Sequence, residues 1–152
     1  MDKKIDKFEL IREQKDRILN KLSKYMGYMD SWRGLANRTV KTRILVDNEN
    51  LQSRNVLSDD ELPILEYYEN EFNFLIFTTS SIYYKHGSIN ISFKYNDIKL
   101  IDSNNDFIRL KEAPDFIDFK LILSDNSRIN FKVETGAPFK AMILLISWHK
   151  NL

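Results

Sequence analysis

The fold class is decided by the stretch from Phe72 to Ile98, which reads FNFLIFTTSSIYYKHGSINISFKYNDI. From Ile89 to Tyr95 apolar and polar residues alternate, which is the period-two pattern of a half-buried strand. Gly87 precedes this strand in a turn, because glycine adopts a positive φ without steric cost. Two earlier strands are predicted at 74–77 and 82–84, the first of them apolar on both faces. The stretch therefore predicts an antiparallel meander.

The meander continues with strands predicted at 98–101 and 107–110, and a second hairpin follows them. The two arms of this hairpin alternate apolar and polar residues over 117–123 and 128–133. Residues directly opposite in a hairpin share a face, so pairing Leu123 with Ile129 keeps both apolar rows on one side. This pairing predicts a loop with an odd number of residues, most simply Asp125 to Ser127, with Asn126 or Ser127 in the left-handed conformation.

The last element is a helix predicted to begin near Pro138, a residue suited to the first helical position. Between Phe139 and Trp148 the only polar residues are Lys140 and Ser147, which lie on one narrow strip. A helix that is apolar nearly all round is buried on more than one side. We therefore expect one face to cover the sheet and another to meet the N-terminal region or a second copy of the chain.

The N-terminal part is predicted to be helical, because apolar residues recur at spacings of three, four and seven over the first 29 residues. Lys15 interrupts this apolar face. A second short helix is expected within Trp32 to Val46.

The segment that follows, Leu57 to Glu71, fits two structures. Ser58 to Glu61 matches a helix capping box, whereas Ile64 to Tyr68 also fits an edge strand begun by Pro63. We favour the strand. The chain is then divided into a helical extension, residues 1–56, and a domain, residues 57–152.

At this point the sequence resembles a known group of domains. The segments LPIL at 62–65, FLIFTTSSIYY at 74–84 and FKYNDI at 93–98 are similar to bacterial pleckstrin-homology-like and GRAM-like domains. The resemblance covers roughly residues 60–150. It implies an α+β fold in which a strongly bent antiparallel β-barrel or sandwich of about seven strands is capped by the C-terminal helix. It also implies a platform that binds membranes or proteins and is not an enzyme.

Phosphoinositide-binding members of these families use clustered Lys and Arg in the loop that joins their first two strands. No such cluster stands in the corresponding part of this chain. The resemblance therefore does not extend to inositol lipid binding.

Composition limits the classes of function. The 152 residues, 43% of them hydrophobic, suffice for one well-covered core. The net charge of +1 gives no global reason to expect nucleic acid or membrane binding, and the absence of cysteine excludes disulfides and thiol chemistry. The charged segment Met1 to Lys7 is not followed by an apolar core, so it does not resemble a signal peptide and a cytoplasmic location is expected.

The candidates for chemistry are few. Two histidines without metal-ligand spacing predict neither a metal site nor a cofactor. A nucleophile–histidine site would require Ser80 or Ser81 to meet His86, with a carboxylate behind the histidine. We interpret the two serines as turn residues and His86 as solvated. The sequence also contains no glycine-rich phosphate loop, so no enzymatic activity is expected.

Charge is distributed unevenly along the chain. The first 43 residues carry 12 Lys and Arg against six Asp and Glu, whereas residues 44–72 carry eight acidic residues and one arginine. This asymmetry predicts an acidic surface that attracts a basic protein partner and raises the rate of encounter. An intramolecular match to the preceding basic region is an equally open interpretation. The candidate partner-binding residues are Asp47, Glu49, Asp59, Asp60, Glu61, Glu66, Glu69 and Glu71.

The basic region supplies the alternative function, a peripheral membrane module that contacts anionic lipid. Its candidate residues are Arg33, Arg38, Lys41 and Arg43. Nucleic acid is not expected as a partner, because the predicted sheet lacks a basic face interleaved with aromatic residues. The sequence thus predicts a non-enzymatic protein–protein interaction module, immunity-like or adaptor-like, with a homodimer as a further arrangement.

Overall fold

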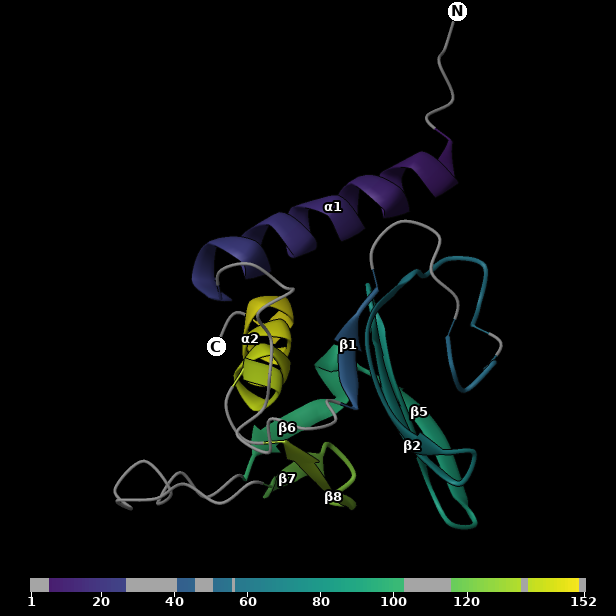
Figure 1. Cartoon of the computed structure of the whole chain (residues 1–152), viewed down its shortest axis with the longest axis vertical. Helices are drawn as coiled ribbons and strands as arrows, with labels where there is room; N and C mark the ends of the chain where they lie inside the picture. Colours follow the sequence, from purple (N-terminus) through teal and green to yellow (C-terminus); the bar gives the residue numbers. More distant parts are fainter. Residues whose placement is uncertain are drawn as a thin grey trace, which may run out of the picture.

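The computed structural model describes residues 6–26, 41–45, 51–55, 57–102, 116–134 and 137–150. Within these ranges the chain is α+β, as predicted, with two helices and two antiparallel sheets (Figure 1). The elements in chain order are α1 (Lys7–Met26), β1 (Thr42–Ile44), β2 (Pro63–Asn70), β3 (Asn73–Thr78), β4 (Ser81–His86), β5 (Ile89–Lys94), the 3-10 turn η2 (Tyr95–Asp97), β6 (Ile98–Ile101), β7 (Phe116–Leu123), β8 (Arg128–Glu134) and α2 (Ala137–Lys150).

The larger sheet has five strands in the order β1-β2-β3-β4-β5. Its central strand β3 is buried on both faces from Phe74 to Thr78, as the apolar run predicted. The strand interpretation of Leu57 to Glu71 is confirmed, because β2 occupies Pro63–Asn70. The predicted second short helix is wrong where the structure describes it, because Thr42–Ile44 forms a strand that pairs with β2. The remainder of that helix, like the strand predicted at 107–110, lies outside the described residues.

The smaller sheet has the order β6-β7-β8 and contains the second hairpin. The predicted pairing of Leu123 with Ile129 is wrong by two residues, because Leu121 pairs with Ile129. A slip of two residues leaves the same side chains on the core face, so alternation alone does not distinguish the two registers. The loop has three residues, Ser124 to Asn126, and Asn126 has the expected left-handed backbone with φ 68°.

The sequence left a barrel or a sandwich open, and the two described sheets do not pair into a closed barrel. At one corner the chain passes directly from β5 through η2 into β6. At another corner β1 approaches the end of β8, where side-chain and not strand-pairing hydrogen bonds connect the two sheets. The described strands therefore form a sandwich of eight strands.

The core lies between the sheets and α2, with Phe77, Phe119 and Met142 fully buried. Helix α1 lies across the end of α2 (Figure 1). The Tyr25 and Trp148 rings are 5.6 Å apart between centroids, so the N-terminal helix contacts α2 near the C-terminal end of α2. Neither α1 nor α2, as described, combines the length and apolar character that a membrane-spanning helix requires.

Candidate functional site

The predicted acidic residues do not lie on one surface. Asp59 and Asp60 lie in the turn before β2, whereas Glu69 and Glu71 lie at its other end. Because a strand rises about 3.3 Å per residue, the two groups are roughly 25 Å apart. Asp47 and Glu49 are outside the described residues.

Glu66 is fully buried on β2 and its carboxylate is used inside the protein. It accepts hydrogen bonds from the backbone N–H groups of Gln52 and Ser53 at 2.8 and 3.0 Å, and from Arg43 Nη2 at 3.2 Å. A buried carboxylate is stable in a folded protein when it is paired and hydrogen-bonded in this way. Glu66 therefore anchors the segment before β2 and is not available to a partner.

Glu61 is also internal, with 5% of its surface exposed. Its carboxylate accepts hydrogen bonds from Thr78 Oγ1 at 2.6 Å, from the Tyr83 hydroxyl and from the Ser58 backbone N–H at 3.3 Å. Burial raises the pKa of Glu61, but these hydrogen bonds outweigh it and leave the pKa below its ordinary value. Burial, followed by the hydrogen bond to Glu61, raises the pKa of Tyr83 to about 12.

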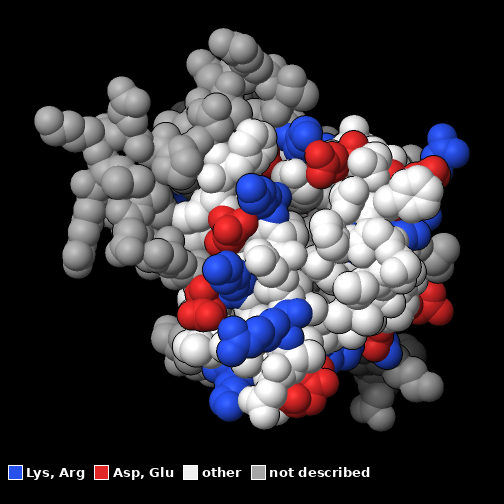
Figure 2. All heavy atoms as spheres, turned by 90° about the horizontal axis from the view of Figure 1, so that it is seen from below, with Lys and Arg blue, Asp and Glu red and all other residues white. Residues whose placement is uncertain are grey.

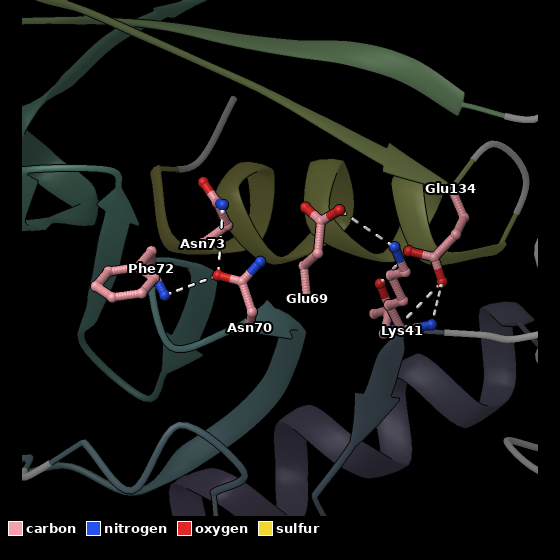
Figure 3. A network of polar contacts seen from close by, with 7 residues as sticks. Lys41, Glu69, Asn70, Phe72, Asn73 and Glu134 are labelled. Carbon is pink, nitrogen blue, oxygen red and sulfur yellow. Dashed lines mark hydrogen bonds and ion pairs between the residues drawn. The ribbon is translucent and has the colours of Figure 1, made fainter.

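The basic candidates face the acidic ones. Lys41 Nζ lies 3.3 Å from Glu69 Oε1 (Figure 3). Arg43 Nη2 lies 3.2 Å from Glu66 Oε1. These two contacts are the intramolecular match that the sequence left open. Arg33 and Arg38 lie outside the described residues. On the face shown in Figure 2, blue and red side chains are interspersed, so this face has no surface of a single sign.

The candidate nucleophile and base lie apart. Ser81 begins β4 and His86 ends it, so the two residues are at opposite ends of one strand. The backbone N–H groups of Ser80 and Ser81 donate to Thr78 Oγ1, as expected of turn residues. Among the described residues, no group of three or more His, Cys, Asp or Glu side chains is placed to hold a metal ion.

His149 is part of the packing between α2 and the β3–β4 turn. Its ring is stacked on Tyr95 with 3.9 Å between centroids. Its two nitrogens contact the carbonyl oxygens of Leu145 and Thr79 at 2.6 and 3.0 Å. The sequence alone did not indicate the contacts with Tyr95 and Thr79, because both residues lie far from His149 in the chain.

A hollow of about 950 Å³ opens beside β1, residues 51–55 and Leu57, and is lined in part by Arg43 and Arg54. A smaller cavity of about 350 Å³ lies between the two sheets. Its lining contains no Ser, Thr or Cys, so among the described residues His86 has no aliphatic hydroxyl or thiol nucleophile beside it there. The residues that line it are Tyr67, Glu69, Asn73, Phe74, Lys85, His86, Asp118, Asn130, Phe131 and Lys132.

The edge strand β5 carries the most exposed apolar residues of the larger sheet. Ile89, Ile91 and Phe93 share one face, as the alternation predicted, but 50% of Ile89 and 38% of Ile91 are exposed, against 7% of Phe93. The second sheet leaves from the Tyr95 end of β5, so it covers Phe93 and not the two isoleucines. Phe72, 55% exposed, lies at the neighbouring turn, where its carbonyl accepts from the Gly87 N–H at 2.9 Å.

No protein-family model, no curated protein and no solved structure matched this chain in the three comparisons. The resemblance to pleckstrin-homology-like domains stays a prediction. The open edge at β5, together with the exposed apolar residues beside it, is the candidate functional surface.

Proposed function

We propose that this protein is a non-enzymatic binding module with a pleckstrin-homology-like fold, and that it binds a protein partner at the β5 edge. The fold part of the proposal is supported by element order, since the seven strands β2 to β8 are followed by α2. The strand β1 is an addition to that order. Fold resemblance alone does not give function, so the functional part depends on the β5 surface.

The observation that carries the function is the exposure of Ile89 and Ile91 on a strand at the end of a sheet. The edge of a sheet presents unpaired backbone groups, and natural proteins cover such edges or place charges on them. Here two of the exposed residues of β5, Ile89 and Ile91, are apolar, and Phe72 adds a third apolar side chain at the same end of the sheet. Apolar surface of this kind marks interaction sites.

Only some of the acidic residues predicted from the sequence are exposed and can contact a partner. Since Glu61 and Glu66 are buried and Glu69 is paired with Lys41, the acidic candidates that remain exposed among the described residues are Asp59, Asp60 and Glu71. Glu71 lies directly beside Phe72, so it can contribute charge at the rim of the apolar surface. A rim charge changes the rate of association more than the affinity.

A photo-crosslinking amino acid tests this function in extracts of the native cell. We would place it at Ile91 and, as a matched control, at Asn20 on the exposed face of α1. A protein that crosslinks from position 91 and not from position 20, and is lost when Ile89 is replaced by lysine, supports the proposal. Equal crosslinking from both positions, or none from position 91, would reject it. Anionic vesicles added at physiological salt should not compete with this crosslink.

A further inference from the structure

The β4–β5 hairpin defines which backbone groups of β5 point away from the sheet. His86 pairs with Ile89 across a two-residue turn, and Gly87 has φ 62°. In such a hairpin the closing pair exchanges its two backbone hydrogen bonds, and bonded and non-bonded pairs then alternate. Ile89, Ile91 and Phe93 therefore direct their N–H and C=O groups toward β4, whereas Asn90, Ser92 and Lys94 direct theirs to the open edge.

The contacts of Lys94 agree with this alternation. Its backbone N–H donates to Asp97 Oδ2 at 3.0 Å and thus not to β4. No described residue forms a backbone hydrogen bond with Asn90 or Ser92 on the open side. Each of these two residues thus offers one donor and one acceptor to an added strand.

The side chains of β5 differ in polarity between the two faces of the sheet. Ile89 and Ile91 are apolar on one face, while Asn90, Ser92 and Lys94 are polar on the other. The segment from Lys85 to Asn96 carries two lysines and no acidic residue, and the next residue, Asp97, accepts from the Lys94 backbone N–H. An added strand that alternates apolar and acidic residues matches both faces, whereas a basic strand would place like charges together.

We propose that the partner binds by strand addition, so that an extended segment alternating apolar and acidic residues forms a sixth strand beside β5. This inference rests on the proposed function, since it describes how the same edge is occupied. Main-chain hydrogen bonds to Asn90 and Ser92 supply affinity, and contacts with Ile89, Ile91 and Lys94 select the sequence. A second copy of the chain is a poorer occupant, because a six-residue strand is much shorter than the about 20–30 residues a side of a standard interface.

Synthetic peptides test the sequence preference. The probes are two fluorescein-labelled decapeptides of alternating valine with glutamate or with lysine, titrated into the full chain and followed by fluorescence anisotropy. The valine–glutamate peptide is expected to bind, with the amide signals of Asn90 and Ser92 moving in NMR spectra. The valine–lysine peptide should bind about tenfold more weakly, because one unfavourable charge contact costs about that factor. If neither peptide binds, or if both bind equally, the inference is wrong.

A pair of substitutions at Ser92 tests the backbone contact itself. Ser92→Pro removes the outward N–H and leaves the hydrogen bonds to β4 in place, since proline is accepted on an edge strand with that side facing solvent. Ser92→Ala keeps the N–H and serves as the control. Binding of the valine–glutamate peptide should fall about tenfold with proline, the factor for one lost hydrogen bond, and stay within about twofold with alanine. Asn90→Pro repeats the test at the second outward position.

The folded state of each proline variant is checked by its circular dichroism spectrum and melting temperature. If the photo-crosslinking amino acid at position 91 captures a protein and the Ser92→Pro substitution does not reduce that crosslink, the proposed function stands and strand addition is wrong. If the valine–glutamate peptide binds and the Ser92→Pro substitution abolishes this binding, strand addition is supported even before a partner is identified. If the chain alone dimerises in sedimentation and Ser92→Pro abolishes the dimer, the occupant is a second copy and the partner assignment is wrong.

Discussion

Glu134 at the end of β8 holds Thr42 of β1 by two hydrogen bonds. Its Oε1 accepts from Thr42 Oγ1 at 2.8 Å, and its Oε2 accepts from the Thr42 backbone N–H at 3.1 Å (Figure 3). The same Oε2 accepts from the Lys41 backbone N–H at 2.9 Å. A single buried carboxylate thus joins the two sheets at a corner where no described strands pair.

Replacing Glu134 should therefore destabilise the sandwich, because its carboxylate is the acceptor for several donors of β1 and the residue before it. Glu134→Ala leaves the backbone N–H groups of Lys41 and Thr42 without their acceptor, and we expect the free energy of unfolding to fall by about 3 kcal/mol. Glu134→Gln keeps one acceptor oxygen and should lose about 1 kcal/mol. Urea unfolding at pH 7 measures both. Equal stability of the alanine variant and the wild type would show that the corner does not depend on this carboxylate.

The hydrogen bonds of Glu61 predict a loss of stability in acid. Because the folded state holds the pKa of Glu61 below its ordinary value of 4.5, the unfolded state binds a proton more readily. The stabilisation is fully present above pH 4.5 and is lost as the pH falls through the folded pKa. Urea midpoints measured between pH 7 and pH 3 should fall less steeply for Glu61→Gln than for the wild type. Identical slopes would mean that Glu61 has no part in the acid sensitivity.

The raised pKa of Tyr83 predicts a loss of stability at alkaline pH. Its pKa is raised to about 12 in the folded state, from an ordinary value of 10. The folded state therefore holds the phenolic proton more tightly than the unfolded state does. The contribution of Tyr83 to the free energy of unfolding is fully present below pH 10 and declines from pH 10 to about 12. Tyr83→Phe should make this decline in stability shallower, whereas Tyr25→Phe on exposed α1 should leave it unchanged. Burial also raises the pKa of Tyr67, Tyr84 and Tyr95, so part of the decline remains in the Tyr83→Phe variant. Melting temperatures at pH 9 and pH 11 provide the comparison.

The sequence predicted those features that depend on local pattern. Alternation identified β5 and the arms of β7 and β8, and Pro63 with the following apolar residues identified β2. The register of the second hairpin was not determined, because pairing Leu123 or Leu121 with Ile129 leaves the same residues facing the core. Three residues, Thr42–Ile44, are too short for periodicity to show a strand.

The candidate site depended on contacts that no local pattern contains. Glu61 and Glu66 have the sequence pattern of surface acids, but their hydrogen-bond donors come from residues up to 23 positions away. Likewise, Ile89 and Ile91 have the pattern of core residues and become exposed because the second sheet begins at the other end of β5. Two of the six described residues of the predicted negative surface, Glu61 and Glu66, are therefore internal, and the apolar edge was found only in the structure.

The N-terminal helix α1 belongs to the extension, residues 1–56, that the sequence analysis predicts to be separate from the domain. Leu22 on α1 is fully buried in the same core cluster as Leu145 and Met142 of α2. Leu22→Ala should lower the free energy of unfolding by about 3 kcal/mol, the cost typical of a buried leucine truncated to alanine. Leu10→Ala, at a position 47% exposed on the same helix, should change it by less than about 0.5 kcal/mol. A single urea transition that shifts for Leu22→Ala would show that α1 unfolds together with the sandwich, whereas an unchanged main transition would make α1 a separate unit, as the boundary at residue 56 implies.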